Sequence, residues 1–166
     1  QEDLQYNKFG RTSFSRITLL RNVDPMIGFA PDEKLKNSYT ALGHFIRAWQ
    51  FFHTTMQVGD VPYAEAVKGE TENTIKPVYD AQKTVFVGIL NELDQADQLF
   101  AVGADFGGDP VYGGKVDKWR RLANSFQLHV LLQLHKKTGD AELKVAQRFN
   151  DIVSNRPLLT SNADNF

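Results

Sequence analysis

One helical stripe of apolar side chains constrains the fold of this chain more than any other feature of its sequence. Between Leu35 and Met56, largely apolar residues recur at alternating spacings of four and three, at positions 35, 39, 42, 46, 49, 53 and 56. A second stripe, at positions 41, 45, 48 and 52, lies beside the first. This spacing is typical of an α-helix. Because the combined face is wider than a surface helix needs, we expect this helix to pack against neighbours on two sides, as in stacked helix pairs.

Two further long helices are expected downstream. The first begins after Asp80, whose carboxylate can cap the free amides of the first turn. Its apolar stripe follows positions 86, 89, 93, 96 and 100. The second runs from about Asp117 to Thr138, with an apolar face through positions 119, 123, 126, 130 and 134, and Gly139 ends it. The chain thus alternates long helical segments with loops.

Two shorter helical segments complete the pattern. Asp140 is expected to cap a helix that Asn155-Arg156-Pro157 stops, because proline cannot continue a helix. At the amino end, Thr12 or Ser13 is expected to cap a segment that Asp24-Pro25 ends. Every periodic segment of the chain therefore has the period of a helix.

The sequence has no pattern that predicts β-strands. No segment alternates apolar and polar residues over four or more positions with enrichment in β-branched residues. Helix pairs joined by turns resemble tetratricopeptide-like packing, although no clean period of about 34 residues is present. We therefore predict a single all-α domain over residues 1–166, built of helical hairpins in a tetratricopeptide-like arrangement with long connecting loops.

Charge balance and the absence of cysteine narrow the functions open to the chain. Its 19 Lys and Arg residues nearly match its 20 Asp and Glu residues, for a formal net charge of -1. Such a chain has no global field that draws it to nucleic acid or to anionic lipid. Without cysteine it forms no disulfide, thiolate metal site or cysteine nucleophile. We expect no nucleic-acid partner.

The two ends of the sequence indicate a fragment of a longer protein. The 166 residues suffice for one buried core, but the chain starts at Gln1 and closes on Asn162-Ala163-Asp164-Asn165-Phe166 without a terminal element. Its apolar runs are far shorter than the roughly 20 residues that cross a bilayer. Any signal that targets the protein to a membrane would then lie upstream, in a signal peptide or a lipidated cysteine.

Two loops rich in glycine and proline hold the candidate ligand contacts. Tyr63 follows Gly59-Asp60-Val61-Pro62, where the glycine suits a helix end and the proline cannot extend a helix. Asp109 and Tyr112 share a second loop, over residues 103–115. A tyrosine ring can pack on the C–H face of a sugar while a neighbouring polar group binds its hydroxyls. We predict Tyr63, Asp109 and Tyr112 as candidate ligand contacts; the alternative is that each tyrosine fixes its loop to the core.

The sequence has no catalytic or metal-binding pattern. None of the four histidines lies in an HExxH motif or at a spacing typical of a zinc site, and His53, on the apolar stripe, is interpreted as a core or boundary residue. Glu65, Glu70 and Glu72 lie in polar sequence typical of a solvated loop rather than of an acid-base pair. Residues 107–115 lack the ending of a phosphate-binding loop. We expect no enzyme activity, no metal and no cofactor.

Four segments, in one order, carry a family resemblance. They are the helix that runs into Gly59-Asp60-Val61-Pro62-Tyr63-Ala64-Glu65-Ala66, the stretch from Pro77 to Ala96, Asp109 to Gly114 with the helix through Trp119 to Phe126, and the closing Pro157 to Phe166. Together they resemble the SusD/RagB family of SusD-like outer-membrane nutrient-binding lipoproteins, over roughly residues 30–166. His129 departs from the pattern, because a basic residue is more frequent there.

The resemblance implies a function that the composition does not reveal. It implies noncatalytic surface binding of an oligosaccharide or another nutrient, followed by delivery to a TonB-dependent, SusC-like outer-membrane transporter. It also implies a surface-exposed outer-membrane lipoprotein whose lipid anchor lies outside this sequence. Because family members are much longer, the chain would form much of their helical scaffold and contribute only part of the sugar site.

Two other functions are compatible with the residues. A cytosolic helical-repeat adaptor would bind peptides or proteins in a concave groove of the same helical hairpins. A glycan-processing hydrolase would need two carboxylates held in a cleft. Sequence upstream of Gln1 separates the first of these from the lipoprotein: a lipobox cysteine there excludes the adaptor, and a cytosolic start codon excludes the lipoprotein.

Overall fold

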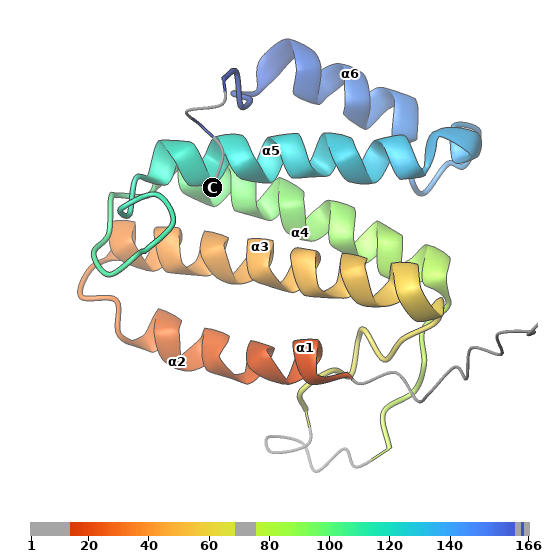
Figure 1. Ribbon diagram of the computed structural model, residues 1–166, viewed down its shortest axis with the longest axis horizontal. Helices are drawn as coiled ribbons and strands as arrows, with labels where there is room; N and C mark the ends of the chain where they lie inside the picture. Colours follow the sequence, from red (N-terminus) through yellow and green to blue (C-terminus); the bar gives the residue numbers. More distant parts are fainter. Residues whose placement is uncertain (1–13, 69–75, 162–163, 165–166) are drawn as a thin grey trace, which may run out of the picture.

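Helices make up the regular elements of this computed structural model, which describes residues 14–68, 76–161 and 164. The long helices lie side by side, each beside its neighbour in the chain (Figure 1). Within the described ranges the β structure consists of one antiparallel bridge between Val61 and Asp80. The prediction of an all-α, tetratricopeptide-like fold is confirmed.

The elements follow the chain in a simple order. They are α1 (Ser15–Thr18), the 3₁₀ turn η1 (Leu19–Asn22), α2 (Val23–Gly28), α3 (Glu33–Val58), α4 (Gln82–Val102), α5 (Val116–Gln133), the 3₁₀ turn η2 (His135–Lys137) and α6 (Val145–Asn155). No helix in the described part of the chain has both the length and the apolar character needed to cross a membrane.

The longest helix, α3, forms where the two apolar stripes predict it. The Leu35 amide donates a hydrogen bond of 2.9 Å to the side chain of Asp32, which caps the helix start. Gly59 ends the helix with a φ of +81°, in the left-handed region that glycine favours. The helix contacts α4 and α5 on one side and α1, η1 and α2 on another. The expectation of neighbours on two sides is therefore confirmed.

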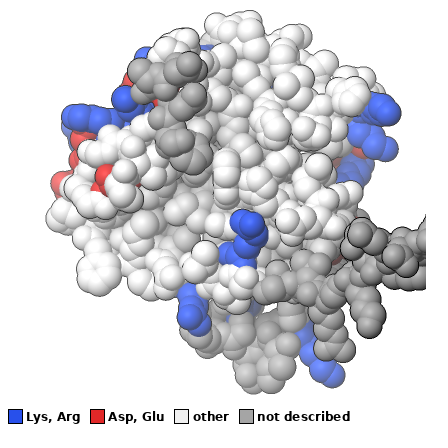
Figure 2. Space-filling view, in the orientation of Figure 1, with Lys and Arg blue, Asp and Glu red and all other residues white. Residues whose placement is uncertain are grey.

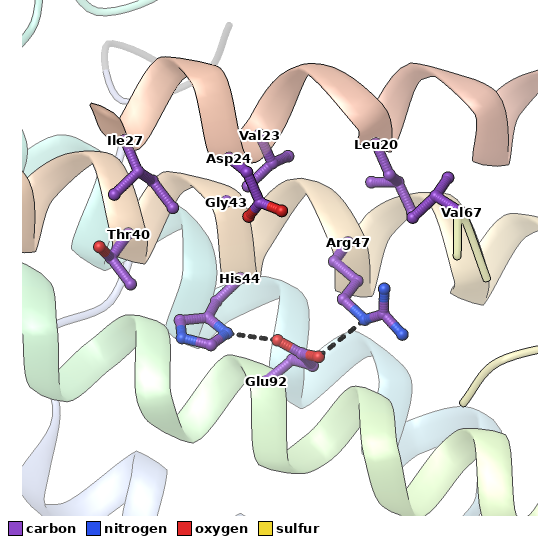
Figure 3. A pocket seen from close by; sticks show the side chains of 10 residues that line it. All are labelled: Leu20, Val23, Asp24, Ile27, Thr40, Gly43, His44, Arg47, Val67 and Glu92. Atoms are coloured by element: carbon purple, nitrogen blue, oxygen red, sulfur yellow. Dashed lines mark hydrogen bonds and ion pairs between the residues drawn. The ribbon is translucent and has the colours of Figure 1, made fainter. Parts of the chain in front are cut away.

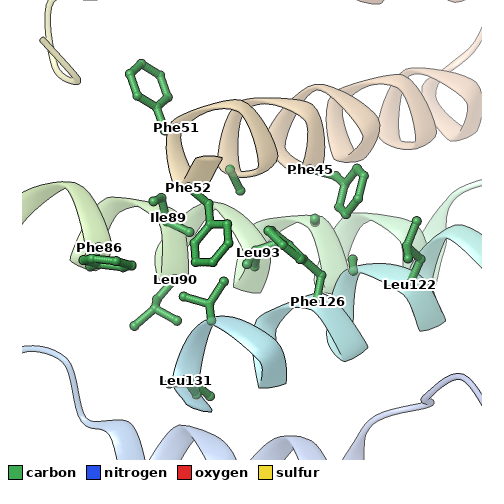
Figure 4. Packing of buried hydrophobic residues seen from close by; sticks show 14 of the residues in the cluster. Phe45, Phe51, Phe52, Phe86, Ile89, Leu90, Leu93, Leu122, Phe126 and Leu131 are labelled. Atoms are coloured by element: carbon green, nitrogen blue, oxygen red, sulfur yellow. The ribbon is translucent and has the colours of Figure 1, made fainter. Parts of the chain in front are cut away.

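The core lies between α3, α4 and α5 (Figure 4). Phe45 and Phe52 of α3 meet Phe126 of α5 with ring centroids 5.9 and 5.3 Å apart. From α4, Ile89 and Leu93 are fully buried beneath these rings. Burying one such side chain stabilises a fold by roughly 1.5–3 kcal/mol. The aromatic layer therefore fixes the three long helices against one another.

Ion pairs fasten α6 to α4. Arg156, at the end of α6, donates a hydrogen bond of 2.9 Å to Asp94 of α4, and Arg148 pairs with the same carboxylate. One turn further along α4, Asp97 accepts a hydrogen bond of 2.7 Å from Arg120 of α5. Because these groups are largely shielded from water, loss of one partner would leave an uncompensated charge.

The cap predicted for α4 is wrong. The Asp80 carboxylate accepts hydrogen bonds of 3.0 and 2.8 Å from the backbone amides of Tyr63 and Ala64. The Gln82 amide, at the helix start, donates a 2.8 Å hydrogen bond to Asp60 instead. The reason is tertiary: the antiparallel bridge at Asp80 brings the earlier loop beside the start of α4.

The predicted cap and end of the later helices also differ from the structure. Asp140 accepts hydrogen bonds from the amides of Glu142 and Leu143, in the turn that precedes α6, and so does not cap that helix. The third long helix stops before the predicted Thr138, because the chain tightens into the 3₁₀ turn η2 after Gln133.

Asp24-Pro25 does not end the first helical segment. Both residues lie in the first turn of α2, where proline is tolerated because its missing N–H would have no intrahelical acceptor. The helical segment therefore continues to Gly28. The predicted caps Thr12 and Ser13 lie outside the described residues.

Candidate functional site

Tyr63 lies with its ring turned into the protein. The ring centroid is 4.8 Å from that of Phe51, and the Arg47 guanidinium lies 4.7 Å from the Tyr63 centroid. A Cβ atom added at Gly88 would come within 2.3 Å of the ring, so only glycine lets the ring lie directly on α4. Burial, and then the charge of Glu92, raise the pKa of the Tyr63 phenol. Tyr63 thus fixes the loop after α3 to both long helices.

A cavity of about 330 Å³ opens between α2 and α3 (Figure 3). Glu92 of α4 forms its floor and interacts with His44 Nδ1 and, at 2.9 Å, with Arg47 Nε. Its Oε1 also accepts a 3.1 Å hydrogen bond from the Tyr63 hydroxyl. Apolar side chains of the amino-terminal helices and Asp24 line the opposite wall. Both oxygens of Glu92 are therefore engaged within the protein.

This cavity combines an apolar wall with a polar floor, and it falls near the small end of the size range of ligand pockets, about 300–1,000 Å³. Among the residues that the structure describes, no group of three or more His, Cys, Asp or Glu side chains could hold a metal ion. The other polar or charged side chains that line the cavity are Asp24, Thr40, His44 and Arg47, of which His44 and Arg47 are paired with Glu92.

Sequence reasoning missed the pairing of His44 with Glu92. His44 and Arg47 are three residues apart, so they lie on one side of α3, and this was the signal available. Their partner is 48 positions away from His44 and reaches them only because α3 and α4 form a hairpin. Spacing rules within one helix do not detect such a partner.

Asp109 organises the loop between α4 and α5. Its carboxylate accepts hydrogen bonds of 2.9, 3.0 and 2.9 Å from the amides of Val111, Tyr112 and Gly114, and one of 2.8 Å from Trp119 Nε1. Burial acts to raise the pKa of Asp109, but these donors outweigh it and hold the pKa below its ordinary value. Four donors match the roughly four acceptor positions of a carboxylate. The carboxylate is therefore engaged by three amides of its own loop and by Trp119 of α5.

Tyr112 is buried at the end of the same loop. Its hydroxyl donates a hydrogen bond of 2.7 Å to the carbonyl of Asp164, and its ring meets Trp119 edge to face at 5.4 Å. Burial, followed by the charges of Asp164 and Asp109, raises the pKa of the phenol. Tyr112 therefore connects this loop to α5 and to the last described residue.

The three candidate residues are not brought to one place. Tyr63 belongs to the loop that follows α3, whereas Asp109 and Tyr112 belong to the loop that follows α4, at the other end of the α3–α4 hairpin (Figure 1). Hydrogen bonds between Ser38 and the backbone of Ala104 tie the second loop to the start of α3. As ligand contacts, the three residues stay predictions.

His53 and Glu65 lie where simple structural roles explain them. His53 is half-buried with its ring 4.7 Å from that of Trp49, and burial, then Arg16 and His129, lower its pKa. Its interpretation as a core or boundary residue is confirmed. Glu65 accepts a 2.7 Å hydrogen bond from the Val78 amide. Glu70 and Glu72 lie outside the described residues.

Comparison with known families identifies the family of this chain. The model of a family described as starch-binding and associating with the outer membrane matches residues 2–166. The chain belongs to the SusD-like family. The resemblance of the four sequence segments is therefore confirmed. No protein with a curated function matches the chain.

Solved SusD homologs share the fold of this SusD-like chain. A SusD homolog from Bacteroides fragilis is 44% identical, with a TM-score of 0.90 over 99% of this chain and 35% of its own. A second B. fragilis homolog is 41% identical, with a TM-score of 0.81 over 95% of this chain and 34% of its own. A Bacteroides vulgatus protein, described as a candidate outer-membrane protein for nutrient binding, is 36% identical, with a TM-score of 0.84 and coverages of 95% and 34%. The chain spans about a third of each structure's length.

Proposed function

We propose that the chain is part of a surface-exposed outer-membrane lipoprotein that binds a glycan or another nutrient and passes it, chemically unchanged, to a TonB-dependent transporter. One observation carries the proposal: a family described as starch-binding and outer-membrane-associated matches residues 2–166, and a SusD homolog has the same fold at 44% identity. Membership of this family favours a nutrient-binding role over the cytosolic adaptor.

The contribution of this chain is a scaffold with two fixed loops. Tyr63 is anchored on Glu92, and Asp109 and Tyr112 are anchored on Trp119 and Asp164. All three act as positioning residues, which hold the loops in the shape that the complete ligand site requires. Because the chain spans about a third of the SusD homologs, most of the ligand contacts come from sequence beyond it.

Location and partner are tested in the cells that make the protein. An epitope tag is placed in the full polypeptide that contains residues 1–166, and intact cells are treated with protease. The proposal predicts that the tag is digested on intact cells, that a lipobox cysteine precedes Gln1, and that a TonB-dependent transporter co-purifies after mild detergent extraction. A periplasmic protein treated in parallel controls for cell lysis. A tag protected until the cells are broken would contradict the proposal.

A further inference from the structure

Tyr79 differs from the two candidate tyrosines in the exposure of its ring. The hydroxyls of Tyr63 and Tyr112 are bound to Glu92 and to the carbonyl of Asp164. Tyr79 is 56% exposed, and within residues 14–68, 76–161 and 164 its hydroxyl has no hydrogen-bond partner. The Tyr79 side chain therefore has both an open ring face and an open polar group.

The backbone on both sides of Tyr79 is fixed. Before it, the Val78 amide donates a hydrogen bond of 2.7 Å to Glu65. After it, the amide and carbonyl of Asp80 form the antiparallel bridge with Val61, through hydrogen bonds of 2.9 and 3.3 Å. A side chain that is already held in place loses little conformational freedom when a ligand binds.

Apolar neighbours support and extend the exposed ring. Phe14, which directly precedes α1, meets Tyr79 edge to face, with ring centroids 6.2 Å apart. Val78 is 67% exposed and adjoins Tyr79 in the chain. The loop between α3 and α4 lies beside the start of α1 in Figure 1. Two segments that are distant in sequence thus present one small aromatic and aliphatic surface.

The chemistry of this surface suits a sugar ring. An aromatic face packs on the C–H face of a sugar, and a hydroxyl can exchange hydrogen bonds with the sugar hydroxyls. Charge does not favour a charged ligand, since the formal net charge is -1 and the charged side chains lie mainly at the edges of the face drawn in Figure 2. A neutral oligosaccharide is therefore the class of ligand that fits best.

We propose that Tyr79 is a glycan contact that this chain contributes to the ligand site of the full polypeptide, with one sugar unit stacked on its ring. This inference rests on the proposed nutrient-binding function and specifies the nutrient as a glycan. It also gives the Tyr63 anchor a purpose. The Asp80 carboxylate accepts hydrogen bonds from the Tyr63 and Ala64 amides, so the anchored loop holds the residue next to Tyr79.

Calorimetry on the full polypeptide that contains residues 1–166 tests the proposal. The probes are malto-, cello-, xylo- and manno-oligosaccharides and host N-glycans. Tyr79→Ala removes the ring, and Tyr79→Phe removes only the hydroxyl. Phe29→Ala is the matched control, because Phe29 is an aromatic residue that is 84% exposed and lies at the end of α2. Thermal unfolding followed by circular dichroism checks that each variant is folded.

The proposal predicts that Tyr79→Ala weakens the binding of each glycan that the native polypeptide binds by at least about fivefold. Tyr79→Phe should weaken it less, because the ring is kept, and Phe29→Ala should leave it unchanged. Undiminished binding by Tyr79→Ala would overturn this inference and leave the nutrient-binding proposal standing. Equal losses for Tyr79→Ala and Phe29→Ala would also overturn it. A native polypeptide that binds none of the probes would overturn the inference together with the glycan form of the proposed function.

Nitration of tyrosine rings by tetranitromethane, mapped by mass spectrometry, gives a second measurement on the native polypeptide. A saturating glycan should slow the nitration of Tyr79 and leave the rate at Tyr63 unchanged, because the Tyr63 ring is packed against Phe51. Nitration of Tyr79 at the same rate with and without glycan would overturn the proposal. So would a Tyr79 ring that resists nitration without glycan, because other parts of the polypeptide would then cover it.

Discussion

Tyr63 donates a 3.1 Å hydrogen bond to Glu92, the same carboxylate that pairs with His44 and Arg47. Tyr63 belongs to the segment Gly59 to Ala66, one of the four segments that carry the family resemblance. In the structure, the same residue anchors this loop to α4. One carboxylate on α4 holds two side chains of α3 and the following loop together. This arrangement explains why Gly88 stands beneath the ring, where any Cβ would collide with it.

Removing the Tyr63 hydroxyl should weaken the fold measurably. We expect Tyr63→Phe to lower the free energy of unfolding by about 1 kcal/mol, the usual net contribution of one hydrogen bond. Urea denaturation of residues 1–166 measures the change. Tyr79→Phe is the matched control, because Tyr79 is 56% exposed and should lose almost nothing. Equal effects of the two substitutions would refute the anchoring role.

Gly114 should not tolerate a side chain. Its φ is +76°, and an added Cβ would lie 1.5 Å from the Phe106 carbonyl oxygen, so the loop must shift. We expect Gly114→Ala to cost more than about 2 kcal/mol of unfolding free energy, as strain and steric overlap do. Gly139→Ala, with no atom within 4 Å of its added Cβ, should be close to neutral. Thermal unfolding followed by circular dichroism compares the two variants.

Asp109 should make the protein sensitive to acid. Its pKa is lower in the folded state than the ordinary value of about 3.9, because loop amides and Trp119 donate to the carboxylate. Its stabilising effect is therefore complete above about pH 4 and is lost as the pH falls through the folded pKa. We expect Asp109→Asn to be less stable than the native chain at pH 7, with a difference that shrinks below about pH 4.

The Asp109 prediction is checked by urea titrations at a series of pH values. Asp32→Asn serves as a control for the general effect of removing a carboxylate, because Asp32 caps α3 with a single hydrogen bond at an exposed position. A difference between Asp109→Asn and the native chain that stays constant from pH 7 to pH 3 would show that the charge of Asp109 does not stabilise the loop.

The long helices followed from the sequence because their apolar stripes are properties of single segments. The register of α3, its end at Gly59 and the burial of Phe45 and Phe52 all follow from local periodicity and turn chemistry. The capping of α4 did not follow, because the acceptor is Asp60, which a bridge between distant residues brings to Gln82. Local rules identify an acid near a helix start but not the loop that folds back over it.

The candidate site was predictable only in part, for the same reason. The sequence singled out Tyr63, Asp109 and Tyr112, each of which is a centre of loop structure, but it gave no means to distinguish a loop anchor from a ligand contact. The role of Glu92 could not be predicted from the periodicity of its own helix, because its partners His44 and Arg47 belong to another helix. The family resemblance came from the order of four segments, which no single spacing rule contains.

Calorimetry with a panel of plant, host and storage glycans tests the central claim most directly, with the full polypeptide and residues 1–166 titrated side by side. The account predicts that the full polypeptide binds at least one glycan with a dissociation constant in the micromolar range or tighter, which corresponds to a binding free energy of about -8 kcal/mol or lower. The glycan should be recovered intact afterwards. Residues 1–166 should give no binding heat at the same concentrations. Micromolar binding by residues 1–166 alone would contradict their role as a scaffold, and cleavage of the bound glycan would contradict noncatalytic capture.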